Sequence, residues 1–129
     1  MSEITLRVGD TSVLDFTITK DGNSIDLKDF LVLFTIKKPF FGSVGLNNPN
    51  DNQAIITKNS DIDKDGGIEK YGSGSIRVIL GSLDTKNILD GEYDYDLQLS
   101  KPGKQDSVLT VDTGVITFTK EITRRTEAL

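Results

Sequence analysis

Acidic residues at alternate positions are the part of this sequence that comes nearest to a chemical site. Asp61, Asp63 and Asp65 are each separated by one residue and are followed by two glycines, which is how the calcium loop of an EF-hand begins. The similarity ends at the last position of such a loop, where a bidentate Glu should close the ligand shell and Gly72 stands instead. Two interpretations stay open: Glu69 or backbone oxygens complete a calcium site, or the segment is an acidic, solvated loop between strands. We adopt the second and expect the chain to need neither a metal nor a cofactor.

The residues of common enzyme chemistry are absent from the sequence. It contains no His, Cys or Trp, so Ser-His-Asp triads, Cys-His pairs and the usual zinc ligand sets cannot form. Pairs of carboxylates remain, but the six Phe and three Tyr are spread along the chain and do not suggest an aromatic-lined cleft around them. No phosphate-binding loop and no dinucleotide fingerprint occurs. We therefore predict that the protein is not an enzyme.

Length and composition are those of one folded domain. Of the 129 residues, 36% are hydrophobic and 27% are charged, and we assign residues 1–125 to a single domain and 126–129 to a loose tail. The net charge of −5 disfavours a nucleic-acid partner, and no apolar run is long enough to cross a membrane. Because the chain has no Cys and no signal-like start, we expect it to be made in a reducing cytosol.

Apolar and polar residues alternate through most of the chain, which is the pattern of half-buried strands. From Phe30 to Ile36 apolar residues occur at both even and odd positions, and so on both faces of the strand, which indicates a central strand. Turn-forming residues separate the strands, and the whole pattern predicts an all-β, immunoglobulin-like antiparallel sandwich of about 7–8 strands with one short helical turn. The clearest alternating strands are centred on Leu6, Phe16, Val78, Leu97 and Phe118.

The local structure of three further stretches is predicted separately. Residues 59–73 are interpreted as a loop, and residues 109–118 as a closing hairpin that turns at Asp112-Thr113-Gly114. A single helical turn is expected between residues 82 and 89, where three apolar residues are available to pack: Leu83, Ile88 and Leu89.

The segment from Phe40 to Asn52 is the main candidate for partner binding. It is longer than most connections in a compact domain, and it keeps apolar residues where a solvated loop would not need them. We therefore expect a partner contact through Phe40, Phe41, Val44 and Leu46, with local cover for the core as the alternative.

Tyr93 is the candidate structural corner. It begins a strand in which Tyr93, Tyr95 and Leu97 share one face. In immunoglobulin-like sandwiches a Tyr at the start of strand F, two residues before the second core Cys, bonds back to the backbone. Tyr93 fits that place and Tyr95 fits the position of the Cys.

Four local patterns, spread over nearly the whole chain, occur in the order of a known domain. They are Leu6-Arg7-Val8-Gly9-Asp10-Thr11 before Leu14-Asp15-Phe16-Thr17-Ile18, the passage from Ile25-Asp26-Leu27 to Val32-Leu33-Phe34-Thr35-Ile36, Gly67-Ile68 before Ile76-Arg77-Val78, and Leu89-Asp90-Gly91-Glu92-Tyr93-Asp94-Tyr95-Asp96-Leu97. In this order the chain resembles the immunoglobulin-like N-terminal domain of baseplate upper proteins of tailed phages. The long segment 40–52 and the acidic segment 61–69 depart from that family.

The resemblance implies a virion part that docks onto neighbouring subunits. Because no receptor-binding module follows in this sequence, we expect a tail or baseplate accessory, an adaptor or a capsid decoration. Its partners would be other virion proteins, in a homo- or hetero-oligomer, with neither nucleic acid nor membrane bound. The alternative is a stand-alone β-sandwich module that binds a carbohydrate or another surface, with calcium assisting.

Overall fold

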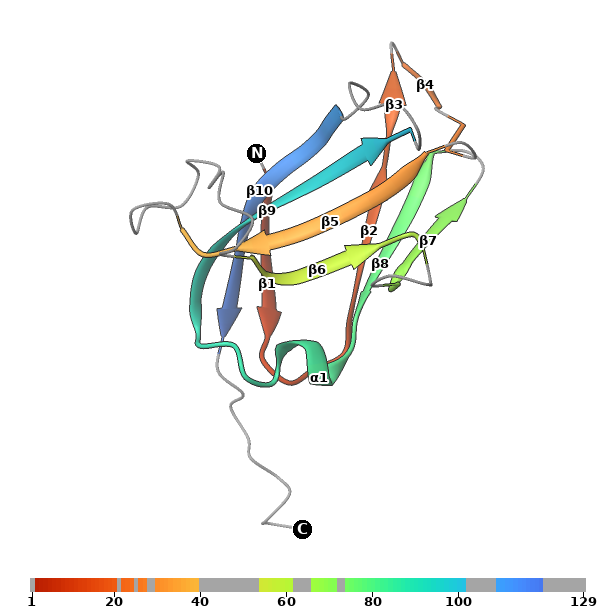
Figure 1. Ribbon diagram of the computed structural model, residues 1–129. Coiled ribbons are helices and arrows are strands. Elements are labelled where there is room, and N and C mark those ends of the chain that lie inside the picture. Colours follow the sequence, from red (N-terminus) through yellow and green to blue (C-terminus); the bar gives the residue numbers. More distant parts are fainter. Residues whose placement is uncertain are drawn as a thin grey trace.

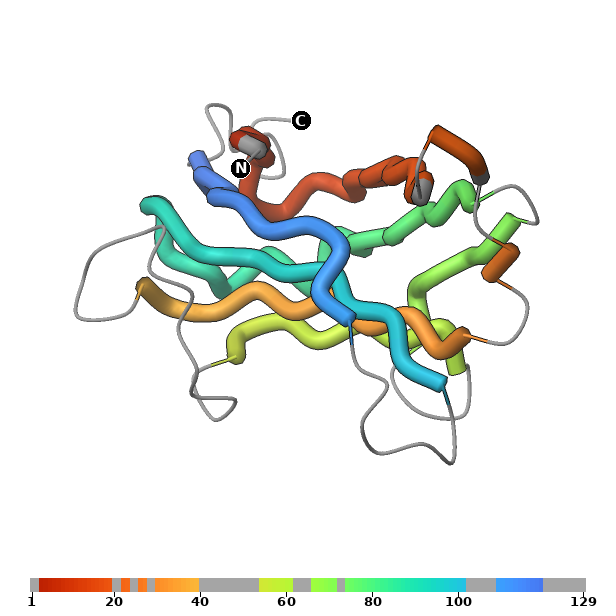
Figure 2. The backbone as a smooth tube through the Cα atoms, turned by 90° about the horizontal axis from the view of Figure 1, so that it is seen from above, coloured from red at the N-terminus to blue at the C-terminus, as the bar shows by residue number. Residues whose placement is uncertain are grey.

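Two β-sheets pack face to face across an apolar core (Figure 1). The computed structural model describes residues 2–20, 22–24, 26–27, 30–39, 54–61, 66–71, 74–101 and 109–119. Seen from above, the strands separate into two layers (Figure 2). The all-β, immunoglobulin-like sandwich predicted from the alternating pattern is confirmed, with eight strands in its two main sheets and one short helix.

The larger sheet has five strands in the order β1-β10-β9-β5-β6, and the smaller has three in the order β2-β8-β7. β1 runs parallel to β10, and every other described pair of strands is antiparallel. The bounds are β1 (Ser2–Arg7), β2 (Ser12–Thr17), β5 (Leu31–Lys37), β6 (Ala54–Asn59), β7 (Ile68–Tyr71), β8 (Ser75–Leu80), β9 (Gly91–Ser100) and β10 (Leu109–Thr119), with the small hairpin β3 (Thr19–Lys20) and β4 (Asn23–Ser24) and the helix α1 (Ser82–Thr85).

This strand order is that of an immunoglobulin domain. β2, β8 and β7 take the places of strands B, E and D, and β5, β9 and β10 those of C, F and G. β6 extends the larger sheet as strand C′ does in variable-type domains. β5 therefore lies between β6 and β9, as the apolar residues on both of its faces predicted.

Three aromatic side chains fill the centre of the core, one from each of three strands. Phe16 lies on β2, Phe34 on β5 and Tyr95 on β9, and their ring centroids are 5.7 to 6.1 Å apart. Antibody domains place two bonded Cys and a Trp on these three strands. Here the link between the sheets is made by aromatic packing, in which each such pair contributes about 0.5–1.5 kcal/mol beyond the area it buries.

The structure corrects the prediction in two strands. β7 forms inside the stretch that was interpreted as a loop, because Ile68 is buried opposite Val78 while its neighbours pair with β8. The expected hairpin near the C-terminus is one strand, β10, with a register irregularity between Thr110 and Asp112, just before the residues where a turn was expected. Asp112-Thr113-Gly114 continues the strand opposite β9.

The helical turn is present, but of its three apolar residues only Ile88 packs against the core. Leu83 and Leu89 are 79% and 78% exposed, and Thr85 is the buried residue of α1 instead. Thr85 accepts a hydrogen bond through its Oγ1 from the Gly9 backbone N–H at 2.9 Å, which ties the helix to the turn after β1. None of the described helices is long and apolar enough to span a membrane.

Candidate docking surface

The four residues predicted to bind a partner, Phe40, Phe41, Val44 and Leu46, lie outside the described residues. The segment that carries them is bounded by the described residues Pro39 and Ala54, which join it to β5 and β6 of the larger sheet. Their role therefore stays a prediction from the sequence.

The acidic residues considered for calcium are only partly described. Asp63 and Asp65 lie outside the described residues, whereas Asp61 and Glu69 lie inside them. The Asp61 backbone N–H donates to Asn59 Oδ1 at 2.8 Å, and the Glu69 carboxylate accepts a hydrogen bond from the Tyr71 hydroxyl on the outer side of β7. Within the described ranges no three His, Cys, Asp or Glu side chains gather in a way that could hold a metal.

Tyr93 makes the backbone contact that a corner residue needs. Its hydroxyl donates to the carbonyl oxygen of Leu89, four residues upstream, at 2.8 Å. Its ring meets Phe118 edge-on, with 5.6 Å between centroids. Burial, with a smaller effect from the Asp90 carboxylate, raises the pKa of Tyr93 above its ordinary value, so the hydroxyl remains a donor at neutral pH.

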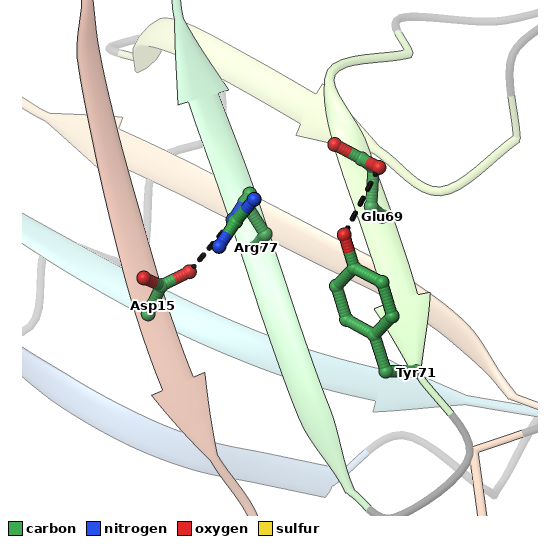
Figure 3. A network of polar contacts seen from close by, with 4 residues as sticks. All are labelled: Asp15, Glu69, Tyr71 and Arg77. Atoms are coloured by element: carbon green, nitrogen blue, oxygen red, sulfur yellow. Dashed lines mark hydrogen bonds and ion pairs between the residues drawn. The ribbon is translucent and has the colours of Figure 1, made fainter.

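The outer face of the β2-β8-β7 sheet carries a polar network that the sequence analysis did not single out (Figure 3). Arg77 in the central strand β8 donates through Nε to Asp15 Oδ1 on β2 at 3.0 Å. The guanidinium also lies 6.0 Å from the centre of the Tyr71 ring, which comes from β7. Tyr71 in turn donates its hydroxyl to Glu69 Oε2 at 3.1 Å. We call these four residues, Asp15, Glu69, Tyr71 and Arg77, the outer-face network.

Strand alternation and register place these side chains together. Residues of even number on β8 face the core, so Arg77 points outward between its register partners Asp15 and Glu69. The hydrogen bond and charge of Asp15 raise the pKa of Arg77, and the hydrogen bond to Glu69 raises that of Tyr71. The guanidinium therefore keeps its charge and the phenol its proton throughout the physiological range.

The outer-face network stays open to solvent although its members hold one another in place. The side chains of Arg77 and Asp15 are 44% and 66% exposed, and Tyr71 and Val13 are 43% and 50% exposed. Tyr and Arg are the residue types that most often dominate interface energy, and fixing them beforehand lowers the entropy lost on binding. This arrangement is suited to binding another surface.

Sequence reasoning could not find the outer-face network because its ion pair joins residues 62 positions apart. Asp15 and Arg77 each stand at a polar position between apolar neighbours, which predicts only that they face outward. That they are directly opposite depends on the register between β2 and β8. Tyr71 was hidden in the stretch interpreted as a loop.

A family model decides the relationship of the chain to known proteins. The BppU N-terminal domain matches residues 1–74, which is more than half of the sequence. The chain belongs to this family. It is therefore a structural domain of a phage baseplate or tail, and as such part of the virion, where it associates with other virion proteins.

Solved structures show weaker likeness. A putative glycoside hydrolase from Bacteroides vulgatus is 13% identical over 95% of this chain, with a TM-score of 0.49, but the match spans only 17% of that protein. The extracellular domain of the voltage-gated sodium channel β4 subunit is 12% identical over 94% of this chain and 92% of its own, with a TM-score of 0.37. No curated protein matches the sequence.

Proposed function

We propose that the protein is a non-catalytic adaptor that holds neighbouring subunits of a phage baseplate or tail together. The observation that carries this proposal is the match to the BppU N-terminal domain over residues 1–74. The absence of His and Cys from the sequence supports a binding role over a catalytic one. The host cytoplasm is the place where such a chain would be made before assembly.

The outer-face network is the surface through which the adaptor contacts a neighbouring subunit. Arg77 presents a fixed cationic fork beside an aromatic ring, with the apolar Val13 on the outermost strand of the same face. A partner that covers this face removes the ion pair and the ring from water, which strengthens both interactions. The network supports this proposal by its exposure and by the residue types it gathers.

The test is to replace Arg77→Ala and Tyr71→Ala separately and to measure how much of each variant enters purified particles. We expect each to lower incorporation by about fivefold or more, the effect of an interface residue contributing about 1 kcal/mol. Because both side chains are exposed, the free energy of unfolding of the chain should change little in either variant.

Arg7→Ala is the matched control. It removes the same side chain from an exposed position on β1, in the other sheet, and should leave incorporation unchanged. Normal incorporation of both Arg77→Ala and Tyr71→Ala would show that the neighbour does not bind this face.

A further inference from the structure

β2 ends its sheet with a row of backbone groups that point away from the domain. The Ile18 N–H donates to the Gly74 carbonyl and the Ile79 N–H donates to the Gly67 carbonyl, both at 2.8 Å. Backbone groups of successive residues in a strand point alternately to its two sides. Together with the register of β2 and β8, these two bonds show that Leu14 and Phe16 direct their N–H and C=O groups to β8. The N–H and C=O groups of Val13, Asp15 and Thr17 therefore face outward, and no other described residue pairs with them.

The other outer strands carry features that discourage pairing with a further strand. β7 has only four residues. Its Lys70 donates to the carbonyl oxygens of Leu27 and Phe30 at 3.3 and 2.7 Å, which places these two residues beside the strand. The pairing of β6 with β5 is irregular next to Lys37. β1 exposes charges of both signs, Glu3 and Arg7. Short length, bulges and charges are the usual protections of a sheet edge.

β2 has only one of those protections, the charge of Asp15, and that charge is paired with Arg77. Its six residues pair with β8 without a register shift, and they include neither Pro nor Lys. Val13 is half exposed, and Asp15 and Thr17 are exposed beside it. A regular, accessible edge of this kind is the template for addition of a strand.

The side chains along β2 define the chemistry of the strand that fits. Asp15 stands on the outer face, and its side chain keeps 66% of its surface exposed while it binds Arg77 from the β8 side. A residue opposite Asp15 on its free side would meet a carboxylate, so a basic side chain is favoured there. On the inner side the half-buried Phe16 favours an apolar neighbour. The net charge of −5 also attracts a basic segment.

We propose that β2 accepts an extended segment of a neighbouring virion subunit as an additional strand, with a basic residue beside Asp15 and apolar residues directed toward Phe16. The backbone groups of Val13, Asp15 and Thr17 form the new ladder. This inference rests on the proposed adaptor function and names the form in which the partner is bound.

Proline substitution separates strand addition from other contacts on the same face. The Thr17 N–H faces the open edge, so Thr17→Pro removes no hydrogen bond to β8 but leaves the added strand without a donor and with a ring in its way. We expect Thr17→Pro to lower incorporation into particles by about tenfold or more. Thr17→Ala keeps the N–H and is the matched control, for which we expect normal incorporation.

The outcomes distinguish the inference from the proposed function. Loss of incorporation in Arg77→Ala with normal incorporation of a folded Thr17→Pro would show a docking face without strand addition. Equal losses in Thr17→Pro and Thr17→Ala would assign the effect to the side chain and would also overturn the inference.

Amide hydrogen exchange on the unmodified chain tests whether a strand is added to β2, even if Thr17→Pro fails to fold. Exchange is compared between the free chain and the chain in intact particles. The backbone amides of Val13, Asp15 and Thr17 should exchange at least about tenfold more slowly in the particle, because they become hydrogen-bonded there. Leu14 and Phe16 are already paired with β8 and report general protection of the strand. If the three outward amides exchange as fast in the particle as in the free chain, no strand has been added.

Discussion

Tyr93 shows how one hydroxyl can fix the connection between the two sheets. The chain leaves β8, passes through α1 and enters β9, and the Tyr93 hydroxyl holds the Leu89 carbonyl just before that entry. The sequence predicted this place because it depends on local spacing alone. Arg77 and Asp15 also meet in a direct hydrogen bond, but their pairing depends on a register that no local pattern records.

Removing that hydroxyl should destabilise the domain measurably. We expect Tyr93→Phe to lower the free energy of unfolding by about 1 kcal/mol, because the Leu89 carbonyl loses a donor while the ring can still pack against Phe118. Urea unfolding of the two proteins measures the difference. Tyr71→Phe is the matched control: it also removes one tyrosine hydrogen bond, but on an exposed strand, and should change stability little. Identical unfolding midpoints for Tyr93→Phe and the unmodified chain would contradict the corner role.

Among the elements, α1 connects strands of both sheets at one end of the sandwich. Asp84 in α1 accepts the Gly81 backbone N–H at 2.7 Å and pairs with Lys58 of β6 at 2.9 Å. α1 directly follows β8 of the smaller sheet, whereas β6 belongs to the larger one. A single carboxylate thus caps the first turn and holds the two layers together.

The stability given by Asp84 should disappear in acid. Burial acts to raise the pKa of Asp84, but hydrogen bonds from Lys58 and Gly81 outweigh it, so the pKa lies below the ordinary 3.8. A lowered pKa in the folded state means that the carboxylate stabilises the fold above pH 3.8 and loses this effect as the pH falls through the folded value.

Asp84→Asn measures that contribution. We expect the variant to be less stable than the unmodified chain by about 1 kcal/mol at neutral pH, a value limited by the partial exposure of the pair. The difference should stay constant down to pH 4 or so and shrink below it, since the carboxylate then becomes neutral like the amide. Urea unfolding at several pH values gives the curve, and a difference that grows on acidification would refute the assignment.

The strands show what the alternation of apolar and polar residues can and cannot predict. Alternation identified β2, β8 and β9 because more buried residues alternate with more exposed ones along most of each strand. β7 was missed because only Ile68 of its four residues is buried, so the segment lacks a period. β10 was divided because Asp112-Thr113-Gly114 has the composition of a turn, although pairing with β9 keeps it extended. Tertiary pairing overrode local preference in both cases.

For the molecule as a whole, the two proposed contact regions belong to different sheets. The outer-face network belongs to the smaller sheet, whereas the segment with Phe40 and Phe41 joins β5 to β6 of the larger one. An adaptor that links subunits needs more than one contact surface. The family match over residues 1–74 contains the whole of segment 40–52 and three residues of the outer-face network, but not Arg77.

Replacing Phe40→Ser and Phe41→Ser together tests the second contact. Because aromatic anchors dominate interface energy, we expect the double variant to enter particles less efficiently by about tenfold or more. Its melting temperature should match that of the unmodified chain, as expected of a docking segment. A collapse of stability would assign the two rings to cover for the core instead, and unaffected assembly would place the contact elsewhere.

Combining these changes with Arg77→Ala shows whether the two surfaces act independently. Sites without shared partners have additive free energies, within about 0.5 kcal/mol, so their effects on assembly should multiply. If Phe40→Ser, Phe41→Ser and Arg77→Ala together reduce incorporation no more than either set alone, both regions bind one partner through a single coupled interface. A multiplied loss supports an adaptor that uses its two sheets for two neighbours.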